Sequence, residues 1–460
     1  MKKINNFNIK NLILVFTLVL MATSCSDWID HDLNTDPDSP ADVPMNLLLP
    51  SIQQKMGYSL LGNDAVRTNN IWTQHFDGVD RQSYTEARYQ ITPADVNNLW
   101  SSVYTGMMIN TSILINKAKT EGAESPNFAG VGQVLMATTL GITTDLFGDI
   151  PYSEALSGSQ NILKPAYDSQ ESIYGSIFSL LDEAVVNLSS TTNAFQVKGD
   201  VCYNGNVDKW KKAAYSIKAR HTLQLSGKKG NAAYTDALAA VANGFSSNAD
   251  DLKVPFEDAN RNPIFQFMEQ RTDIRMGGTF IDMLLDSNDP RLPFYAAKDS
   301  DGNYSGSAAG SQNPDASRPG SYIASFNSSV SLMTYSELKF IEAEARLMLG
   351  QAGAQQAYEA AVAASVLRVT GSANTAWLVA NINGVPVTLQ NIIEQKYIDG
   401  VSTNQPYADY RRTGFPVLTI AQGALIPSIP VRFPYPQSEF DYNNENVPTV
   451  VLTDKVWWDQ

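Results

Sequence analysis

The sequence predicts a mainly α-helical protein in which tetratricopeptide-like helix pairs form a scaffold for an irregular, loop-rich layer with a few short strands. Three observations predict this fold class. Apolar residues recur every three or four positions over long windows. Two such windows, 334–350 and 354–371, are separated by only a few residues, which favours an antiparallel helix hairpin. The strand–helix alternation typical of a parallel sheet is not visible.

The first 24 residues have the pattern of a secretory signal peptide. Basic residues precede an apolar run over 12–21, and this run is shorter than the roughly 20 residues needed to span a bilayer. Small residues then lead into Cys25, in an arrangement that resembles a bacterial lipobox. We therefore expect removal of residues 1–24 and lipidation of Cys25. A cleaved signal followed by an incidental cysteine is the alternative.

Residues 25–44 are acidic and rich in proline and serine, which predicts a lipidated N-terminus and an extended tether. The segment "SDWID" resembles the export signal that sends such lipoproteins to the cell surface. A single domain over 45–460 follows the tether. Cys202 then has no disulfide partner, and we interpret it as a half-buried small apolar residue rather than a nucleophile.

Composition restricts the function further. The net charge of −14 and the pI near 4.7 argue against a nucleic-acid ligand, because binding phosphate requires a positive surface. The three histidines, His31, His75 and His221, lie too far apart in sequence to show a metal-binding spacing. We expect no cofactor.

The first strongly periodic helix covers 92–119. Thr92 is its expected N-cap and Pro93 its first helical residue. Its apolar face consists of Val96, Leu99, Val103, Met107 and Leu114. A second helix over 128–147 is its expected partner.

Further helices follow in order. One over 169–190 begins at the capping residue Ser169, and one from Asp208 is expected to end at Gly227 as a C′ glycine. After the hairpin described above, 388–400 forms another helix. The segments 250–326 and 414–460 are rich in Pro, Gly, Asn, Ser and aromatics, and they predict loops, where binding residues tend to lie.

The stretch "DLFGDIPYSEAL" over 145–156 contains three carboxylates and could hold a general acid/base pair. A retaining glycosidase needs two carboxyls about 5 Å apart across an open cleft. Gly148 and Pro151 instead favour a helix end, because glycine tolerates positive φ and proline blocks continuation. Asp149 and Tyr152 are then expected to satisfy backbone groups at the reversal.

Two polar motifs have both a structural and a functional interpretation. Asp299, Asp301 and Asn303 place oxygen atoms at alternate positions, but the glutamate that closes a calcium loop is missing, so a polar turn is favoured. Arg411 and Arg412 could bind a carboxylate ligand. We favour a structural ion pair.

Six stretches occur in an order and spacing that resemble the SusD/RagB family: "LFGDIPYSEAL", "YDSQESIYGSIFSLLDEAVVNL", "YNGNVDKWKKAAYSIKARHTLQLS", "MTYSELKFIEAEARLMLG", "RRTGFPVL" and "IPVRFPYPQSEFDYNNENV". The resemblance covers essentially the whole mature chain. It implies four helix pairs and a lipid-anchored, outward-facing outer-membrane protein without enzymatic activity. It also implies a SusC-like TonB-dependent transporter as partner, and a captured oligosaccharide or, in one branch, a peptide.

In that family the ligand site lies where loops after the first helices meet the irregular middle segment. Sugars stack their C–H faces on aromatic rings, and polar side chains bind their hydroxyls. The resemblance therefore points to a set of aromatic and polar residues in these loops: Asn69, Asn70, Trp72, Asp80, Arg81, Gln82, Tyr84, Tyr295, Tyr304 and Tyr322. Trp72 and Tyr295 could instead belong to the core. A glycan-cleaving enzyme is the rival function class.

Overall fold

The computed structural model describes residues 42–460, and Met45–Gln460 form one compact unit. The predicted signal peptide, the lipidation of Cys25 and nearly all of the tether lie outside the described residues. Within residues 42–460, no helix is both long enough and apolar enough to cross a membrane.

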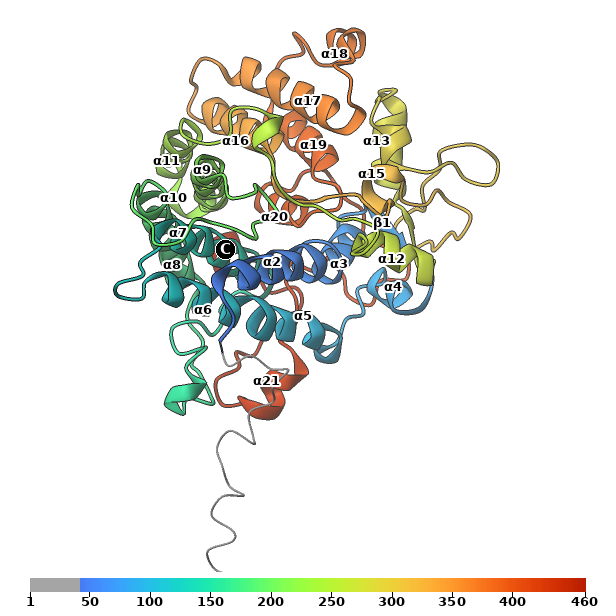
Figure 1. Cartoon of the computed structure of the whole chain (residues 1–460). Coiled ribbons are helices and arrows are strands. Elements are labelled where there is room, and N and C mark those ends of the chain that lie inside the picture. Colours follow the sequence, from blue (N-terminus) through green and yellow to red (C-terminus); the bar gives the residue numbers. More distant parts are fainter. Residues whose placement is uncertain (1–41) are drawn as a thin grey trace, which may run out of the picture. The chain divides into compact units, whose positions relative to one another are not determined.

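Four pairs of adjacent helices form the scaffold of the described unit (Figure 1). The pairs are α2 (Met45–Lys55) with α6 (Ile109–Ala118), α7 (Pro126–Phe147) with α8 (Gln170–Asn187), α9 (Val207–Gln224) with α11 (Asn231–Val241), and α16 (Tyr335–Met348) with α17 (Ala354–Thr370). Successive pairs touch through α6 and α7, α8 and α9, and α11 and α16. This arrangement confirms the predicted mainly helical fold and the hairpin of α16 and α17.

The first predicted helix begins as expected and is then interrupted. The Thr92 amide donates to the Asp95 carboxylate at 2.7 Å, which closes a capping box ahead of Pro93. The chain continues through η4 (Pro93–Val96), α5 (Asn97–Ser101) and the π-helical η5 (Ser102–Met108) into α6. The five predicted apolar positions are all buried, since each exposes 3% or less of its surface.

The other helix boundaries agree with the sequence except at one glycine. Ser169 caps α8 by accepting from the Ser172 amide at 3.3 Å, as predicted. The prediction that Gly227 ends the next helix is wrong. α9 ends at Gln224 because the chain bends to bury Leu225 against Tyr174, and Gly227 lies inside the short α10 (Ser226–Lys229).

The loop-rich layer contains more regular structure than predicted. Two small antiparallel sheets pair β1 (Phe76–Gly78) with β3 (Ile274–Met276) and β2 (Leu252–Val254) with β4 (Val330–Met333). Short helices lie between these strands: η7 (Asn248–Asp250), α12 (Pro263–Gln270), α13 (Gly278–Asp286), α14 (Leu292–Tyr295) and α15 (Ser321–Ala324). The Asn262 side chain caps α12. This capping signal was overlooked because the segment is rich in proline and was predicted to be a loop.

Shorter elements connect the scaffold to this layer. They are η3 (Met56–Leu60), α3 (Asp64–Trp72), α4 (Arg81–Glu86), η6 (Gly158–Gln160), α18 (Thr375–Asn381), α19 (Leu389–Asp399), α20 (Gln405–Thr413), α21 (Gln437–Tyr442) and η8 (Trp457–Asp459). In Figure 1 the segments around β1, α4, α12 and α13 lie together on the right, away from α7 to α11. Cys202 is partly buried, as predicted, and burial raises the pKa of its thiol well above the usual value.

Candidate ligand-binding site

The "DLFGDIP" stretch is the end of α7. Gly148 follows the helix with φ = 81°, as its sequence context predicts. The carboxylate of Asp145 accepts from the Tyr174 hydroxyl at 2.7 Å and from Trp458 Nε1 at 2.9 Å. Burial raises the pKa of Asp145 to about 6, although the nearby Arg411 guanidinium opposes this shift. This carboxyl is partly buried and lines, with Arg220 and Arg411, a cavity of about 30 Å³ that has room for water only.

The other two acids of the longer stretch "DLFGDIPYSEAL" bind backbone amides. Asp149 accepts from the Gln170 amide at 2.7 Å, as expected, and Glu154 accepts from the Ala166 amide at 2.9 Å. The expected role of Tyr152 is filled by another residue, because Asp168 accepts from the Tyr152 amide at 2.8 Å. The geometry supports the structural interpretation of this motif.

The two adjacent arginines have separate structural roles. Arg412 makes a buried ion pair with Glu344, with one contact at 2.8 Å, and also contacts Asp409 at 3.0 Å. Within residues 42–460, Arg411 forms no such pair. It donates to the Asp145 carbonyl at 2.7 Å and lies over the Tyr407 ring. The predicted ion pair is therefore confirmed for Arg412 only.

Trp72 lies in the core rather than on an exposed loop. Its side chain is completely buried, its Nε1 donates to the Glu86 carbonyl at 3.2 Å, and its ring packs edge-on against Phe433. Asn69 and Asn70 on the same helix are also buried. Asn69 donates to Asn404 at 2.6 Å, so all three residues fix α3 against the C-terminal third of the chain. The prediction that Asn69 and Asn70 face a ligand is wrong, since α3 turns them inward, and for Trp72 the alternative of a core residue is the correct one.

Tyr295 and Tyr322 also point into the protein. Tyr295 is completely buried and packs against Phe280. Tyr322 is partly buried and its hydroxyl accepts from Arg368, which also pairs with Asp399. For Tyr295 the alternative of a core residue is the correct one, because its ring is completely buried. Tyr322 is corrected to a structural residue, because its hydroxyl is an acceptor for the buried Arg368.

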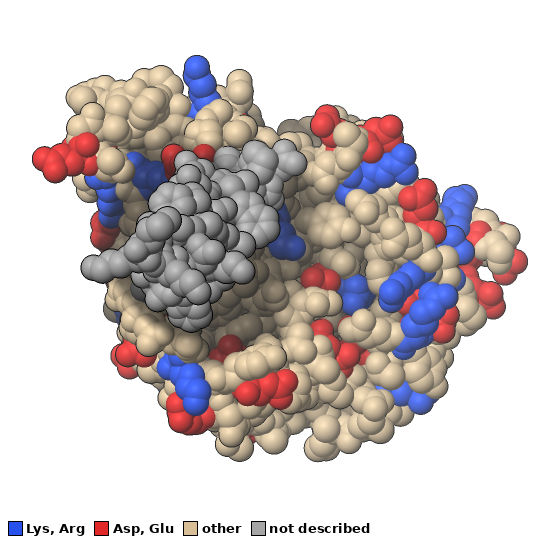
Figure 2. Space-filling model, turned by 60° about the horizontal axis from the view of Figure 1, so that its bottom comes forward, with Lys and Arg blue, Asp and Glu red and all other residues tan. Residues whose placement is uncertain are grey.

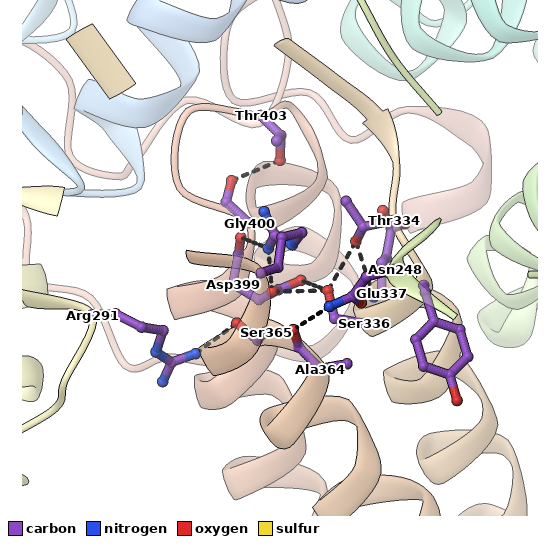
Figure 3. A network of polar contacts seen from close by, with 12 residues as sticks. Asn248, Arg291, Thr334, Ser336, Glu337, Ala364, Ser365, Asp399, Gly400 and Thr403 are labelled. Atoms are coloured by element: carbon purple, nitrogen blue, oxygen red, sulfur yellow. Dashed lines mark hydrogen bonds and ion pairs between the residues drawn. The ribbon is translucent and has the colours of Figure 1, made fainter. Parts of the chain in front are cut away.

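Figure 3 shows the network to which Asp399 belongs. Ser336 donates to Asp399 at 2.9 Å from α16, and Arg291 donates to Ser365 at 2.8 Å. A cavity of about 40 Å³ lies beside Tyr322 and Asp399. It has room for water only, whereas small-molecule pockets typically enclose about 300–1,000 Å³. The network therefore ties helices together and is not a ligand site.

The start of α4 places its polar residues on the surface. Asp80 caps the helix by accepting from the Arg81 amide at 2.9 Å. The Arg81 guanidinium pairs with the buried carboxylate of Asp273, while about half of its own side chain remains exposed. Gln82 follows and is partly buried. These residues remain accessible, and they line one border of the loop layer.

The "DSDGNYSG" stretch forms a polar turn. The Asp299 carboxylate accepts from the Asn303 amide at 2.9 Å, the Asp301 amide at 3.0 Å and the Ser305 hydroxyl at 2.6 Å. These hydrogen bonds, that from Ser305 first, lower the pKa of Asp299. Among the described residues no cluster of three or more His, Cys, Asp or Glu could hold a metal. Tyr304, in the same turn, is partly exposed, and the Lys298 ammonium lies 5.8 Å from its ring centroid.

Tyr84 is the predicted aromatic residue best placed to meet a ligand. Its side chain is 37% exposed, and the Arg88 guanidinium lies 4.4 Å from the ring centroid. Gln312 accepts from Arg88 at 2.9 Å and donates to the Tyr84 carbonyl at 3.0 Å. We call Tyr84, Arg88 and Gln312 the Tyr84 platform. Both Arg88 and Gln312 were missed from the sequence. Only the fold brings Gln312 to Tyr84, whereas Arg88 follows Tyr84 at the local i,i+4 spacing.

A third segment completes the surroundings of the platform. The Leu425 amide donates to the Arg88 carbonyl at 3.0 Å, and Gly423 approaches the Arg88 side chain so closely that an added Cβ would lie 3.2 Å from Nε. Ile420 and Leu425 expose more than half of their surface. Three segments distant in sequence thus meet here and present an aromatic ring, polar groups and exposed aliphatic side chains.

Comparison with known proteins identifies relatives of the whole domain. A family profile named SusD-like and described as "Starch-binding associating with outer membrane" matches residues 37–436. A structure of a chitin-binding protein is 27% identical, with a TM-score of 0.80 over 91% of this chain and 100% of the other. No curated protein matches the chain.

Two further structures share the fold. A SusD/RagB family protein from Bacteroides thetaiotaomicron is 24% identical, with a TM-score of 0.77 over 91% of this chain and 99% of that chain. A chitin-binding SusD homolog from Flavobacterium johnsoniae is 24% identical, with a TM-score of 0.79 over 90% and 98%. Together with the profile match over residues 37–436, this architecture establishes that the chain belongs to the SusD-like family of starch-binding proteins that associate with the outer membrane.

Proposed function

We propose that this chain is a non-enzymatic, outward-facing lipoprotein of the outer membrane, anchored through Cys25, that binds an oligosaccharide and delivers it to a SusC-like TonB-dependent transporter. The observation that carries the binding part is the Tyr84 platform. An accessible ring held from one side by a guanidinium can stack against the C–H face of a sugar. Gln312 and Arg88 add donors and acceptors for hydroxyl or acetamido groups.

One feature of the chain supports capture rather than cleavage, and a second concerns the charge of the ligand. The carboxylates of the "DLFGDIP" stretch bind amides and ring N–H or hydroxyl groups of the protein itself, so they do not face a substrate. Acidic and basic side chains are interspersed over the face in Figure 2. A face of mixed sign exerts no strong attraction on a highly charged polymer, and this suits a neutral or weakly charged glycan.

The ligand class follows from the relatives. The family description specifies starch, and two similar structures are of chitin-binding proteins. We therefore infer that a neutral glucan or an N-acetylated glucosamine oligomer occupies the platform. A peptide ligand, found in one branch of the family, is the alternative.

The test is direct binding of malto-oligosaccharides, chito-oligosaccharides and a peptide pool, measured by calorimetry. We expect at least one oligosaccharide to bind, and Tyr84→Ala to weaken that binding at least about fivefold, since loss of an aromatic stacking contact removes about 1 kcal/mol or more. Tyr442→Ala is the matched control, because this tyrosine is 77% exposed on α21. Binding of peptides alone, or release of shortened sugars by the pure protein, would overturn the proposal.

The anchor and the partner are tested in cells. Cys25→Ala should leave a folded protein that no longer incorporates palmitate or sediments with outer membranes. A tagged parent chain in mild detergent should recover an outer-membrane barrel transporter. Continued lipid labelling of the variant would contradict the anchor, and repeated recovery of a lone chain from cells that express the transporter would contradict the partnership.

A further inference from the structure

Asp77 is a buried carboxylate in the middle of β1, beside the Tyr84 platform. Its residue is only 1% exposed. Arg275 lies directly opposite it in the β1–β3 register, but the Arg275 guanidinium donates to carbonyl oxygens, including that of Pro314 at 2.7 Å. No lysine or arginine of the described residues pairs with Asp77, and burial raises the pKa of its carboxyl. Its hydrogen-bond donors therefore come from another part of the chain.

Apart from the amide of the neighbouring Gly78, these donors belong to the turn at 307–312. The Ser307 hydroxyl donates to Asp77 at 2.5 Å, the Gly310 amide at 3.0 Å and the Gln312 amide at 2.9 Å. Both carboxylate oxygens are used. Hydrogen bonds from amides to an ionised acceptor are about twice as strong as neutral ones, so this carboxylate defines the position of the turn.

The backbone of the turn would not hold this shape unaided. Gln312 has φ = 61°, a strained conformation that side-chain-bearing residues rarely adopt. Gly310 has φ = 70°, and a Cβ there would lie 2.4 Å from the Gln422 carbonyl oxygen. The Asp77 carboxylate supplies the hydrogen bonds that stabilise this conformation, and the close approach to Gln422 links the turn to the third segment of the site.

Gln312 connects the turn at 307–312 to the Tyr84 platform. Its amide binds Asp77, while its side chain contacts both Arg88 and the Tyr84 carbonyl. A shift of the turn would move the side-chain amide away from Arg88, and the guanidinium that backs the Tyr84 ring would lose its only described side-chain hydrogen bond. The contacts thus run without a break from Asp77 through Gln312 to Tyr84.

We propose that Asp77 is the positioning residue of the ligand site: its ionised carboxylate holds the turn at 307–312 so that Gln312 and Arg88 fix the Tyr84 ring before ligand arrives. This inference rests on the proposed function for its effect on affinity. The preorganisation itself is a property of the free protein and is measurable without a ligand.

The matched pair of variants is Asp77→Asn and Asp299→Asn. Both carboxylates organise the same loop through three donors, but Asp299 does so at the exposed tip. Amide hydrogen exchange of the free chain is the first readout. Asp77→Asn should speed exchange in peptides covering both 307–313 and 84–90, whereas Asp299→Asn should affect only 299–306. Unchanged exchange over 84–90 in Asp77→Asn would overturn the proposal, whatever the chain binds.

Affinity for chitohexaose and maltohexaose is the second readout. Asp77→Asn should weaken binding about tenfold, and Asp299→Asn by less than about twofold. Gln312→Ala should reproduce the loss of affinity, and the double variant Asp77→Asn with Gln312→Ala should lose no more than either single variant, because both act through one contact. Additive losses would contradict positioning through Gln312. A parent chain that binds neither sugar nor the wider panel would defeat the proposed function, while the exchange experiment would still decide the role of Asp77.

Discussion

The helical scaffold and the loop layer use their buried charges in different ways. In the scaffold, ion pairs join helices that are already hydrogen-bonded internally: Arg220 on α9 pairs with Glu337 on α16 at 2.6 Å. In the loop layer, carboxylates without a cation partner bind backbone amides, as Asp77 binds Gly310 and Gln312. Loops leave amides unpaired, and these need acceptors when buried. The loop layer also contains buried ion pairs, such as Asp289 with Arg291. The difference therefore lies in the additional role of single carboxylates such as Asp77, which satisfy loop amides that no helix pairs.

The largest expected effect separates a core ring from a site ring. Trp72→Ala should lower the free energy of unfolding by about 3–5 kcal/mol, because it removes a completely buried indole and leaves a cavity. Urea denaturation followed by circular dichroism measures it. A loss below about 1 kcal/mol would show that Trp72 does not belong to the core.

The second prediction tests the charge pairs of the scaffold. Arg220→Met should destabilise by about 3 kcal/mol, since Glu337 would remain as an uncompensated buried charge. Arg261 provides the control, because its ion pair with Asp258 is exposed and Arg261→Met should change stability by less than about 1 kcal/mol. If both variants lost the same free energy of unfolding, the buried pair would not stabilise the fold more than the exposed pair does.

The third prediction concerns pH and Asp145. Burial raises its pKa in the folded protein to about 6, above the unfolded value of about 3.9. The folded state therefore binds the proton more tightly, and this contribution to stability is present below about pH 4 and is lost as the pH rises through 6. The expected loss is roughly 2–3 kcal/mol.

Asp145→Asn isolates that contribution. Asp251 also has a pKa raised to about 6 by burial. The pH dependence of the unfolding free energy of the parent chain therefore cannot be assigned to Asp145 alone. The difference in unfolding free energy between the parent and Asp145→Asn should shift in favour of the variant between pH 4 and pH 7. A pH-independent difference would mean that Asp145 does not titrate in this range.

The smallest stability effect is expected at the loop layer. Tyr84→Ala should change the free energy of unfolding by no more than about 0.5 kcal/mol, as is usual for accessible side chains. Calorimetric melting of Tyr84→Ala beside Trp72→Ala gives the contrast directly. A loss of several kcal/mol at Tyr84 would show that the platform supports the fold rather than a ligand.

The helices were predictable because their signals are local. The Thr92 capping box and the cap at Ser169 each lie at one helix start, and the apolar stripe from Val96 to Leu114 lies within one continuous run of helical turns. The prediction that Gly227 ends α9 was wrong because a tertiary contact decides the boundary: the chain leaves the helix after Gln224 and buries Leu225. The short helices of 250–326 were missed because each has only one or two turns.

The site was only partly predictable. Tyr84 and Trp72 look alike in sequence as loop-adjacent rings, yet α3 carries Trp72 into the core while α4 leaves Tyr84 accessible. Gln312 and Asp77 gave no signal, since the contacts of Gln312 with Arg88 and with Asp77 join positions more than 200 residues apart. No local spacing rule can bring such residues together.

The position of Trp458 has a consequence for biosynthesis. Its indole donates to Asp145 across 313 residues of sequence, and its amide binds the Gln170 side chain at 3.2 Å. At typical translation rates of about 5–20 residues per second, roughly 15–60 s separate the emergence of Asp145 from that of Trp458. During this interval the second helix pair lacks two of its polar partners. The native packing around α7 and α8 is therefore completed only after Trp458 has been made, so the position of one tryptophan sets how late this part of the core can close.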